Sequence, residues 1–408
     1  MKPTVLRRML LPAGDGNAPR RRDLLLGELD GRPAVLRIAD RIEPPADADV
    51  IDGKGVLLLP AFTDIGAILS DPNRPLRETP ATAAAAALAG GYRRIAACPD
   101  EKGRPADPAR YPAPLSVYPL LPLTEPETIA AARPALWFDG GGAPSDSGRL
   151  RAILSACRES GGRYVSSARD RSLFGQGAVA AGRAEKWTGA PGIPVSAESA
   201  AVARELILAA ETGCPIHFLA LSSAESIGMI RLAKARGVPV TCGVSPFHLA
   251  MTEQDVVYYG ASAKLNPPLR TGADRDALRE AALDGTVDCL TSLHTPLTGA
   301  ERALPIASAP FGASSLDTAP SVLLTYLPEL LRDKPDRLAS LLSIRPAELL
   351  GLDVRIREGG PADLVGIDPR AEVFVSANTL QSRGVGTPFL GQTLRGRVTL
   401  RIFDGVRI

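Results

Sequence analysis

The sequence predicts an α/β protein, a (β/α)8 barrel flanked by β-rich chain ends. Three observations lead to this prediction. The chain has 408 residues, its middle alternates apolar strand-like runs with helical stretches, and its two ends contain short strands and turns instead. Eight strands that alternate with helices over ~290 residues are typical of such a barrel.

The two chain ends show strand and turn patterns. Residues 23–29 and 34–38 flank the turn pair Asp30-Gly31, which favours a hairpin. In the tail, apolar residues at 398, 400 and 402 alternate with polar ones, and Asp404-Gly405 marks a second turn. This alternation predicts half-buried strands.

The middle of the chain supplies the predicted barrel. The strand-like runs are 56–62, 94–98, 115–121, 135–138, 163–166, 215–221, 238–244 and 287–291. The clearest helical stretches are 79–89, 147–159, 197–212, 223–235, 274–283 and 316–332. In such a barrel the carboxyl ends of the strands hold the active site.

Two connections are too poor in helix-forming residues to complete the outer ring. Five prolines stand between residues 98 and 115 (Pro99, Pro105, Pro108, Pro112, Pro114), and a proline inside a helix costs about 3 kcal/mol. The next connection, 124–133, has room for only a short helix. We therefore expect the outer helices near strands 2 and 3 to be shortened or missing. The Gly-rich segment 170–194 predicts a long loop.

Composition excludes several classes of protein. Apolar residues make up 45% of the chain and the net charge is +2, so nothing draws the whole protein to nucleic acid. No apolar run is long enough to cross a membrane, and residues 1–8 lack a secretion signal. Five widely spaced cysteines indicate reduced thiols in the cytoplasm.

Several motifs carry a family resemblance. They include Leu-Leu-Pro-Ala-Phe-Thr-Asp at 58–64, Asn-Pro-Pro-Leu-Arg at 266–270 and Thr-Pro-Phe-Leu-Gly-Gln at 387–392. In this order they resemble dihydroorotase, of the cyclic amidohydrolase superfamily, over nearly the whole chain. The resemblance implies a barrel at 57–349 and a small β-sandwich made from both termini, 1–56 plus 350–408.

The resemblance also implies a zinc site, and the matching positions here have changed. The family's four zinc-binding positions, its catalytic Asp and the last His of its Asp-His-Ala-Pro-His motif fall on Gly66, Ile68, Ser167, Ala220, Leu293 and Leu297. Most of these side chains offer no nitrogen, oxygen or sulfur donor, and Leu293 cannot exchange a proton. We therefore expect no metal and no cofactor.

A few polar residues match the family's binding positions and are expected as vestiges. These are Asn266, His294, Asp139 and Asp100, where Asp139 matches one of two adjacent family Asp residues. The family's substrate-gripping Arg falls on Ser70. The side chains of Leu293, Leu297 and Ile68 could fill the old pocket or leave it open.

The physical consequence of losing zinc is large. Zinc lowers the pKa of bound water from ~15.7 to ~7, which corresponds to about 12 kcal/mol of water activation. The chain has three histidines, His217, His248 and His294, too few to rebuild the site. His217 fits a hydrogen-bonded core position better than a ligand. His248 follows a strand end, and Cys98 has no base near it in the sequence.

The resemblance, together with the losses, implies a catalytically inactive dihydroorotase homologue. Non-catalytic dihydroorotase-like chains of bacteria assemble with aspartate carbamoyltransferase, six chains of each kind. We therefore expect a cytoplasmic homodimer that binds the catalytic chains of that enzyme in pyrimidine biosynthesis.

Other functions remain open. The barrel could bind a metabolite as a sensor without turnover. It could be a metal-independent enzyme that uses Asp139, Asp100 or Cys98. It could also be an active dihydroorotase whose metal ligands lie elsewhere in the sequence.

Overall fold

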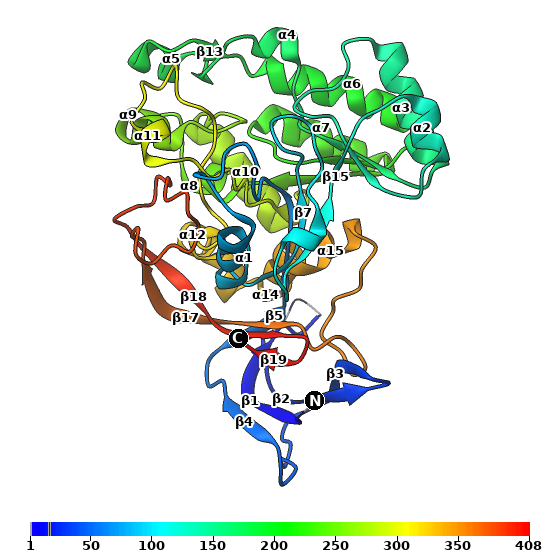
Figure 1. Ribbon diagram of the computed structural model, residues 1–408, viewed down its shortest axis with the longest axis vertical. Helices are drawn as coiled ribbons and strands as arrows, with labels where there is room; N and C mark the ends of the chain where they lie inside the picture. Colours follow the sequence, from blue (N-terminus) through cyan, green and yellow to red (C-terminus); the bar gives the residue numbers. More distant parts are fainter. Residues whose placement is uncertain (1, 15, 17) are drawn as a thin grey trace.

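The two ends of the chain meet in one sheet, in the lower part of Figure 1. The computed structural model describes residues 2–14, 16 and 18–408, and within them this sheet has eight strands. Their order is β19-β18-β17-β5-β1-β2-β3, with β4 paired to β1. The bounds are β1 (Thr4–Leu11), β2 (Arg20–Leu29), β3 (Arg32–Ala39), β4 (Asp49–Asp52), β5 (Leu57–Pro60), β17 (Leu364–Phe374), β18 (Thr393–Phe403) and β19 (Val406–Arg407).

The predicted turns in this sheet are confirmed. Asp30 and Gly31 join β2 to β3 with φ values of +51° and +74°, and Asp404 and Gly405 join β18 to β19 in the same way. Gly and Asp tolerate this left-handed backbone, which matches the twist of the flanking strands. Alternate side chains of the sheet, such as Leu24, form its buried core.

The barrel strands follow one another as parallel neighbours. They are β6 (Phe62–Ala67), β7 (Tyr92–Ala97), β8 (Ser116–Pro119) continued by β9 (Leu121–Pro122), β10 (Leu136–Phe138), β11 (Arg163–Ser166), β14 (Ile216–Phe218), β15 (Val240–Val244) and β16 (Cys289–Leu290). The ring closes where Ser292, just after β16, donates to Asp64 of β6 from both its amide and its hydroxyl, at 2.7 and 2.6 Å. The predicted barrel is confirmed.

Two predicted strands needed correction. Residues 57–60 of the first run pair with β17 and β1 in the terminal sheet, and the first barrel strand is β6 instead. The run 115–121 is divided, because β8 pairs with β7 whereas β9 pairs with β10. An apolar run alone does not reveal which sheet receives it.

Helices cover the outside of the barrel. The larger ones are α1 (Pro80–Ala89), α3 (Ser147–Glu159), α6 (Ser196–Thr212), α7 (Ala224–Ala235), α10 (Gly272–Asp284) and α12 (Ala319–Tyr326). The shorter ones are α8 (Pro246–Ala250), α9 (Asp255–Tyr259), α11 (Gly299–Arg302), α13 (Glu329–Arg332), α14 (Pro335–Ala339), α15 (Arg345–Leu349) and the single turns η2 (Gly260–Ala263) and η3 (Ser340–Ile344). Polar caps define several starts; Thr79, for example, accepts from the amide of Thr82.

The outer ring is thin where the prolines predicted it. Only η1 (Pro108–Arg110) follows β7, and the six-residue α2 (Pro126–Ala131) follows β9. Two other predictions were incomplete. The stretch 316–332 breaks at Pro328 into α12 and α13. The segment 170–194 contains α4 (Arg171–Phe174), β12 (Val179–Ala180), α5 (Arg183–Thr188) and β13 (Gly192–Ile193).

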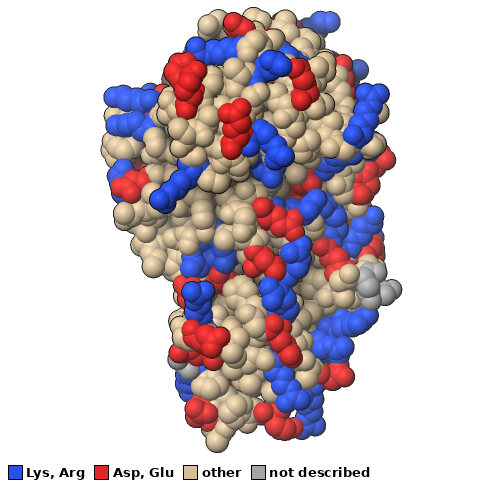
Figure 2. All heavy atoms as spheres, turned by 90° about the vertical axis from the view of Figure 1, so that its right-hand side faces the viewer, with Lys and Arg blue, Asp and Glu red and all other residues tan. Residues whose placement is uncertain are grey.

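The surface carries mixed charge. Figure 2 shows basic and acidic side chains interspersed over the face drawn there, as the net charge of +2 suggests. In the part of the chain that the structure describes, no helix is long and apolar enough to cross a membrane.

Candidate functional site

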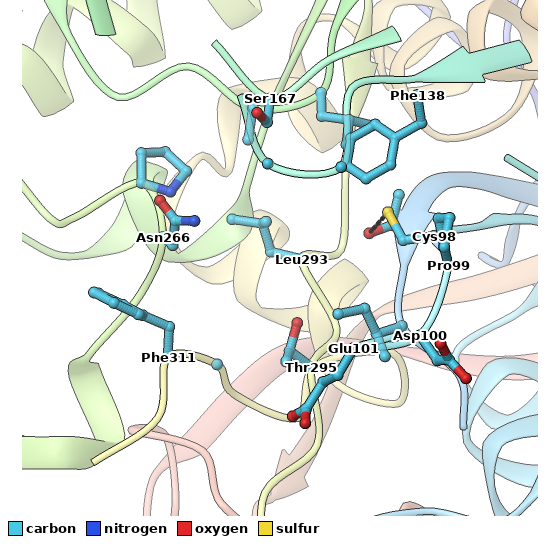
Figure 3. Close-up of a pocket in the computed structure, with 18 of the residues that line it drawn as sticks. Cys98, Pro99, Asp100, Glu101, Phe138, Ser167, Asn266, Leu293, Thr295 and Phe311 are labelled. Atoms are coloured by element: carbon cyan, nitrogen blue, oxygen red, sulfur yellow. Dashed lines mark hydrogen bonds between the residues drawn. The ribbon is translucent and has the colours of Figure 1, made fainter. Parts of the chain in front are cut away.

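A pocket of about 370 Å³ opens at the carboxyl ends of the barrel strands. Its walls include residues at or just beyond β6, β7, β9, β10, β11, β14 and β16, together with the loop after β15. Figure 3 shows Leu293 near its centre, Phe138 and Phe311 on opposite sides, and Asn266 next to the Leu293 side chain. This is where barrels of this kind place their ligands.

The structure brings most of the changed positions together. Gly66, Ile68, Ser167, Ala220 and Leu293 all line the same pocket. Leu297, by contrast, is fully buried and lies outside the lining. The aliphatic side chains therefore leave a pocket open at the strand ends, and Ile68 and Leu293 form part of its wall.

Gly66 shows why the first of these positions no longer suits a histidine. Its φ is +104°, and a Cβ added there would lie 2.7 Å from Cδ2 of Leu219. Real Cβ atoms essentially never approach a neighbour so closely, and the backbone conformation itself is strained for any residue with a side chain. Leu219 thus occupies the space that a side chain at position 66 would need.

Asp139 stabilises a turn and does not line the pocket. Its Oδ1 accepts from the Gly141 amide at 3.1 Å, and its Oδ2 accepts from the Ser167 amide and hydroxyl at 3.0 and 3.1 Å. Burial raises the pKa of Asp139, although these hydrogen bonds oppose the rise. Asp139, which was expected as a remnant of the binding site, therefore has structural contacts and lies behind the lining residue Ser167.

His294 likewise contacts neighbouring protein groups, Ser315 and Glu78, and does not line the pocket. Its Nδ1 accepts from the Ser315 amide at 3.1 Å, so the proton is on Nε2, which lies 3.5 Å from Oε2 of the buried Glu78. Burial by itself raises the pKa of Glu78, but the facing imidazole of His294 and hydrogen bonds from Ser382 and Thr82 outweigh it and lower the pKa. His294 joins the last barrel strand to the start of α1.

Asp100 and Asn266 do line the pocket, as their family positions suggested. Asp100 is paired with Arg104 at 2.6 Å and accepts from the Lys102 amide at 2.9 Å. Burial acts to raise the pKa of Asp100, yet the hydrogen bonds from Arg104 and Lys102 lower it. The Asp100 carboxylate at this rim is therefore ionised, and Arg104 balances its charge.

The other two histidines, His248 and His217, make hydrogen bonds within the fold. His248 donates from Nε2 to the Pro267 carbonyl at 3.1 Å and contacts the Ser245 hydroxyl, which supports the loop that carries Asn266. His217 is buried between β14 and β15, 2.9 Å from Oγ1 of Thr241. Burial lowers the pKa of His248 to about 4 and that of His217 to about 3, so both are neutral at pH 7.

Cys98 and Ser70 offer little chemistry. Cys98 lines the pocket, but burial raises the pKa of its thiol far above neutrality, which leaves it protonated and weakly nucleophilic. Its sulfur lies 3.4 Å from the Gly66 carbonyl. The Ser70 hydroxyl is hydrogen-bonded to the Tyr111 hydroxyl at 2.9 Å.

The residues present do not fit a zinc ion. A hydrolytic zinc site uses about three protein ligands with nitrogen, oxygen or sulfur donors. Among residues 2–14, 16 and 18–408, no group of three His, Cys, Asp or Glu side chains could hold a metal ion. Gly66, Ile68 and Ala220 have no donor atom in their side chains, and Asp139 lies outside the lining with both carboxylate oxygens already hydrogen-bonded.

Several lining residues were missed by sequence reasoning. Phe138, Phe311, Leu265, Glu101 and Thr295 are among them. Phe311 lies in the motif Ala-Pro-Phe-Gly at 309–312, which contributed to the family resemblance but indicated no role. Apolar wall residues are hard to recognise because their spacing equals that of ordinary core residues.

Comparison with known proteins gives curated relatives of similar length. The chain is 32% identical over 397 residues to a dihydroorotase of Staphylococcus aureus (strain Mu50 / ATCC 700699), covering 92% of this chain and 93% of that protein. It is 35% identical over 382 residues to a dihydroorotase of Lactiplantibacillus plantarum, covering 88% of each. No family model matches the chain.

Solved structures share the fold at lower identity. A dihydropyrimidinase from Brevibacillus agri NCHU1002 aligns with a TM-score of 0.84 and 20% identity, covering 100% of this chain and 95% of that one. An L-hydantoinase from Arthrobacter aurescens aligns with a TM-score of 0.84 and 22% identity, covering 100% and 96%. At these identities the likeness concerns the barrel and its terminal sandwich alone.

Proposed function

This chain belongs to the dihydroorotase family, and we propose that it is a member without hydrolytic activity that serves as an assembly partner of aspartate carbamoyltransferase. The observation that carries the proposal is the composition of the barrel pocket. Positions that should hold zinc, or should move a proton, are Gly66, Ile68, Ala220 and Leu293. The relatives themselves are named as dihydroorotases, so the proposal rests on these residues and not on the family.

The missing donors argue against hydrolysis on physical grounds. Without zinc, water keeps its high pKa, and about 12 kcal/mol of activation is forfeited. Leu293 stands at the family's acid–base position and has no proton to exchange. The backbone at Gly66 adds an obstacle, because its φ of +104° strains any residue with a side chain and Leu219 would also have to move.

The backbone at Leu293 supports descent from an active site. Its φ is +52°, in the left-handed region that Asp and Asn enter several-fold more readily than most residues. A leucine is a poor choice for that conformation, whereas the family's aspartate is a good one. The conformation thus fits an ancestral acid whose chemistry has since been lost.

An assembly role is supported by what the chain keeps. Barrel and terminal sheet are both intact, with extended buried cores, although the site chemistry is absent. Exposed apolar side chains also gather where α5 and α9 lie side by side: Trp187 is 48%, Val257 49% and Tyr258 84% exposed. Exposed aromatic side chains are enriched at protein–protein interfaces.

The proposal includes a homodimer and a cytoplasmic location. A scaffold must present at least two contact surfaces, which a dimer does by symmetry. The five cysteines are all free and buried, as a reducing compartment allows. Light scattering should report twice the 42.7 kDa chain mass for the protein alone. A monomer mass at working concentration would contradict the dimer.

Co-expression with the aspartate carbamoyltransferase of the same organism tests the assembly role. We expect one stable mixed complex on a sizing column with light scattering, and carbamoyltransferase activity that depends on this chain. The transferase expressed alone is the control. Two separate peaks, with a transferase that is equally active alone, would remove the proposal.

A further inference from the structure

The barrel pocket is open, with a volume of about 370 Å³, and its chemistry is not that of a metal site. Its lining is mostly apolar, with Ile68, Phe138, Leu219, Leu265, Leu293 and Phe311 among the wall residues. Neutral polar side chains are few: the Asn266 amide, which offers a donor and an acceptor, and the hydroxyls of Ser167 and Thr295, of which the Ser167 hydroxyl already donates to Asp139. A concave, mainly apolar wall with a few polar groups is the usual form of a small-molecule site.

No described lining residue is a Lys, Arg or His, and two are acids, Asp100 and Glu101. The guanidinium groups nearest to these acids are already paired. Arg104 binds Asp100 at 2.6 Å, and Arg77 binds both Glu101 and Glu301. The rim therefore offers an incoming anion no free counter-charge.

Two other cations close to the pocket are also engaged. The Lys264 ammonium donates to the Ile306 carbonyl at 2.6 Å and lies 4.7 Å from the ring centre of Phe311, outside the lining. The Arg169 guanidinium donates to the Gly141 carbonyl and stacks 4.6 Å from the ring centre of Phe174. An anion could recruit either group only by breaking these contacts.

We propose that this pocket binds an uncharged ring compound, with its polar edge at Asn266, and rejects carboxylates. Phe138 and Phe311 on opposite sides provide aromatic surfaces for a flat ring (Figure 3). A carboxylate would leave water for a mostly apolar wall that offers it no cationic partner, which is unfavourable. The ligand class thus differs from dihydroorotate, which carries a carboxylate. This inference does not depend on the assembly role.

A matched pair of probes tests the inference. Dihydroorotate and its methyl ester share one ring and differ in whether the carboxyl group is charged. We expect isothermal titration of the full chain, at millimolar probe, to show at least about tenfold tighter binding of the ester. Equal or tighter binding of dihydroorotate would overturn the inference, and so would the failure of both probes to bind.

Pocket variants locate the binding. Leu293→Trp fills the centre of the pocket and should abolish ester binding, while Leu232→Trp on the exposed face of α7 should leave it unchanged. Leu293→Lys, which adds the missing cation, should reverse the preference toward dihydroorotate. A loss of structure would lower the affinity for both probes, so this reversal cannot come from misfolding. Unchanged ester binding in Leu293→Trp, or an unchanged preference in Leu293→Lys, would refute the site.

Discussion

Glu205 on α6 is a fully buried carboxyl group whose replacement should stabilise the protein. Neither of its carboxyl oxygens hydrogen-bonds to a described residue. Burial raises its pKa from 4.5 to about 8; the charge of Asp139 adds to the rise, while Ser166 and Arg204 oppose it. Glu205→Gln removes the ionisation and keeps nearly the same shape.

The expected gain depends on pH in a defined direction. Because the folded-state pKa is above the unfolded value, the folded chain keeps a proton that the unfolded chain releases between pH 4.5 and 8. The native protein therefore loses stability as the pH rises through this window, and the variant does not. At 1.36 kcal/mol per pKa unit, the gain is about 1 kcal/mol at pH 5 and about 3 kcal/mol at pH 7.

Urea denaturation at pH 5, 7 and 8 measures the effect. Glu211→Gln is a matched control on the same helix, because Glu211 is half exposed and pairs with Arg151 at 2.6 Å. Its free energy of unfolding should change by less than about 1 kcal/mol at every pH. A Glu205→Gln gain that does not grow between pH 5 and pH 7 would refute the reasoning.

Two other substitutions test the site and its rim. Gly66→His should lower the free energy of unfolding by about 3 kcal/mol, because the backbone φ is unfavourable for a side chain and the side chain would meet Leu219. Adding Leu219→Ala should recover part of that loss. A Gly66→His variant that is fully stable in urea denaturation would contradict the steric argument. Glu301→Gln should cost about 1 kcal/mol at pH 7, because solvent screens this partly exposed carboxylate. Burial raises the Glu301 pKa, but bonds from Arg77 and Thr298 lower it to about 2, so this stabilisation is lost as the pH falls from 4.5 to 2. A cost that persists at pH 2 would contradict the assignment.

Much of the fold could be predicted because local signals agreed with the tertiary structure. The prolines between 98 and 115 exclude a long helix whatever the tertiary packing around them. Asp30-Gly31 specifies a hairpin through its own backbone preference. The division at Ala61 could not be predicted, because the apolar run 56–62 continues across it and only the pairing of residues 57–60 with β17 separates the two strands.

The candidate site was predicted in position but not in detail. Matching motifs placed Gly66, Ile68 and Leu293 at one strand-end pocket. They could not show that Asp139 accepts from Ser167 or that His294 faces Glu78, because those contacts join segments far apart in the chain. Side-chain direction at a strand end depends on such partners.

Zinc content and turnover measured together test the central claim most directly. The full chain would be incubated with excess zinc, freed of unbound metal, and assayed for bound zinc and for cyclisation of carbamoyl-aspartate. The arrangement at Gly66, Ile68, Ala220 and Leu293 predicts substoichiometric zinc and no cyclisation above the uncatalysed rate. Stoichiometric zinc with turnover that a chelator abolishes would show that the chain is a working dihydroorotase.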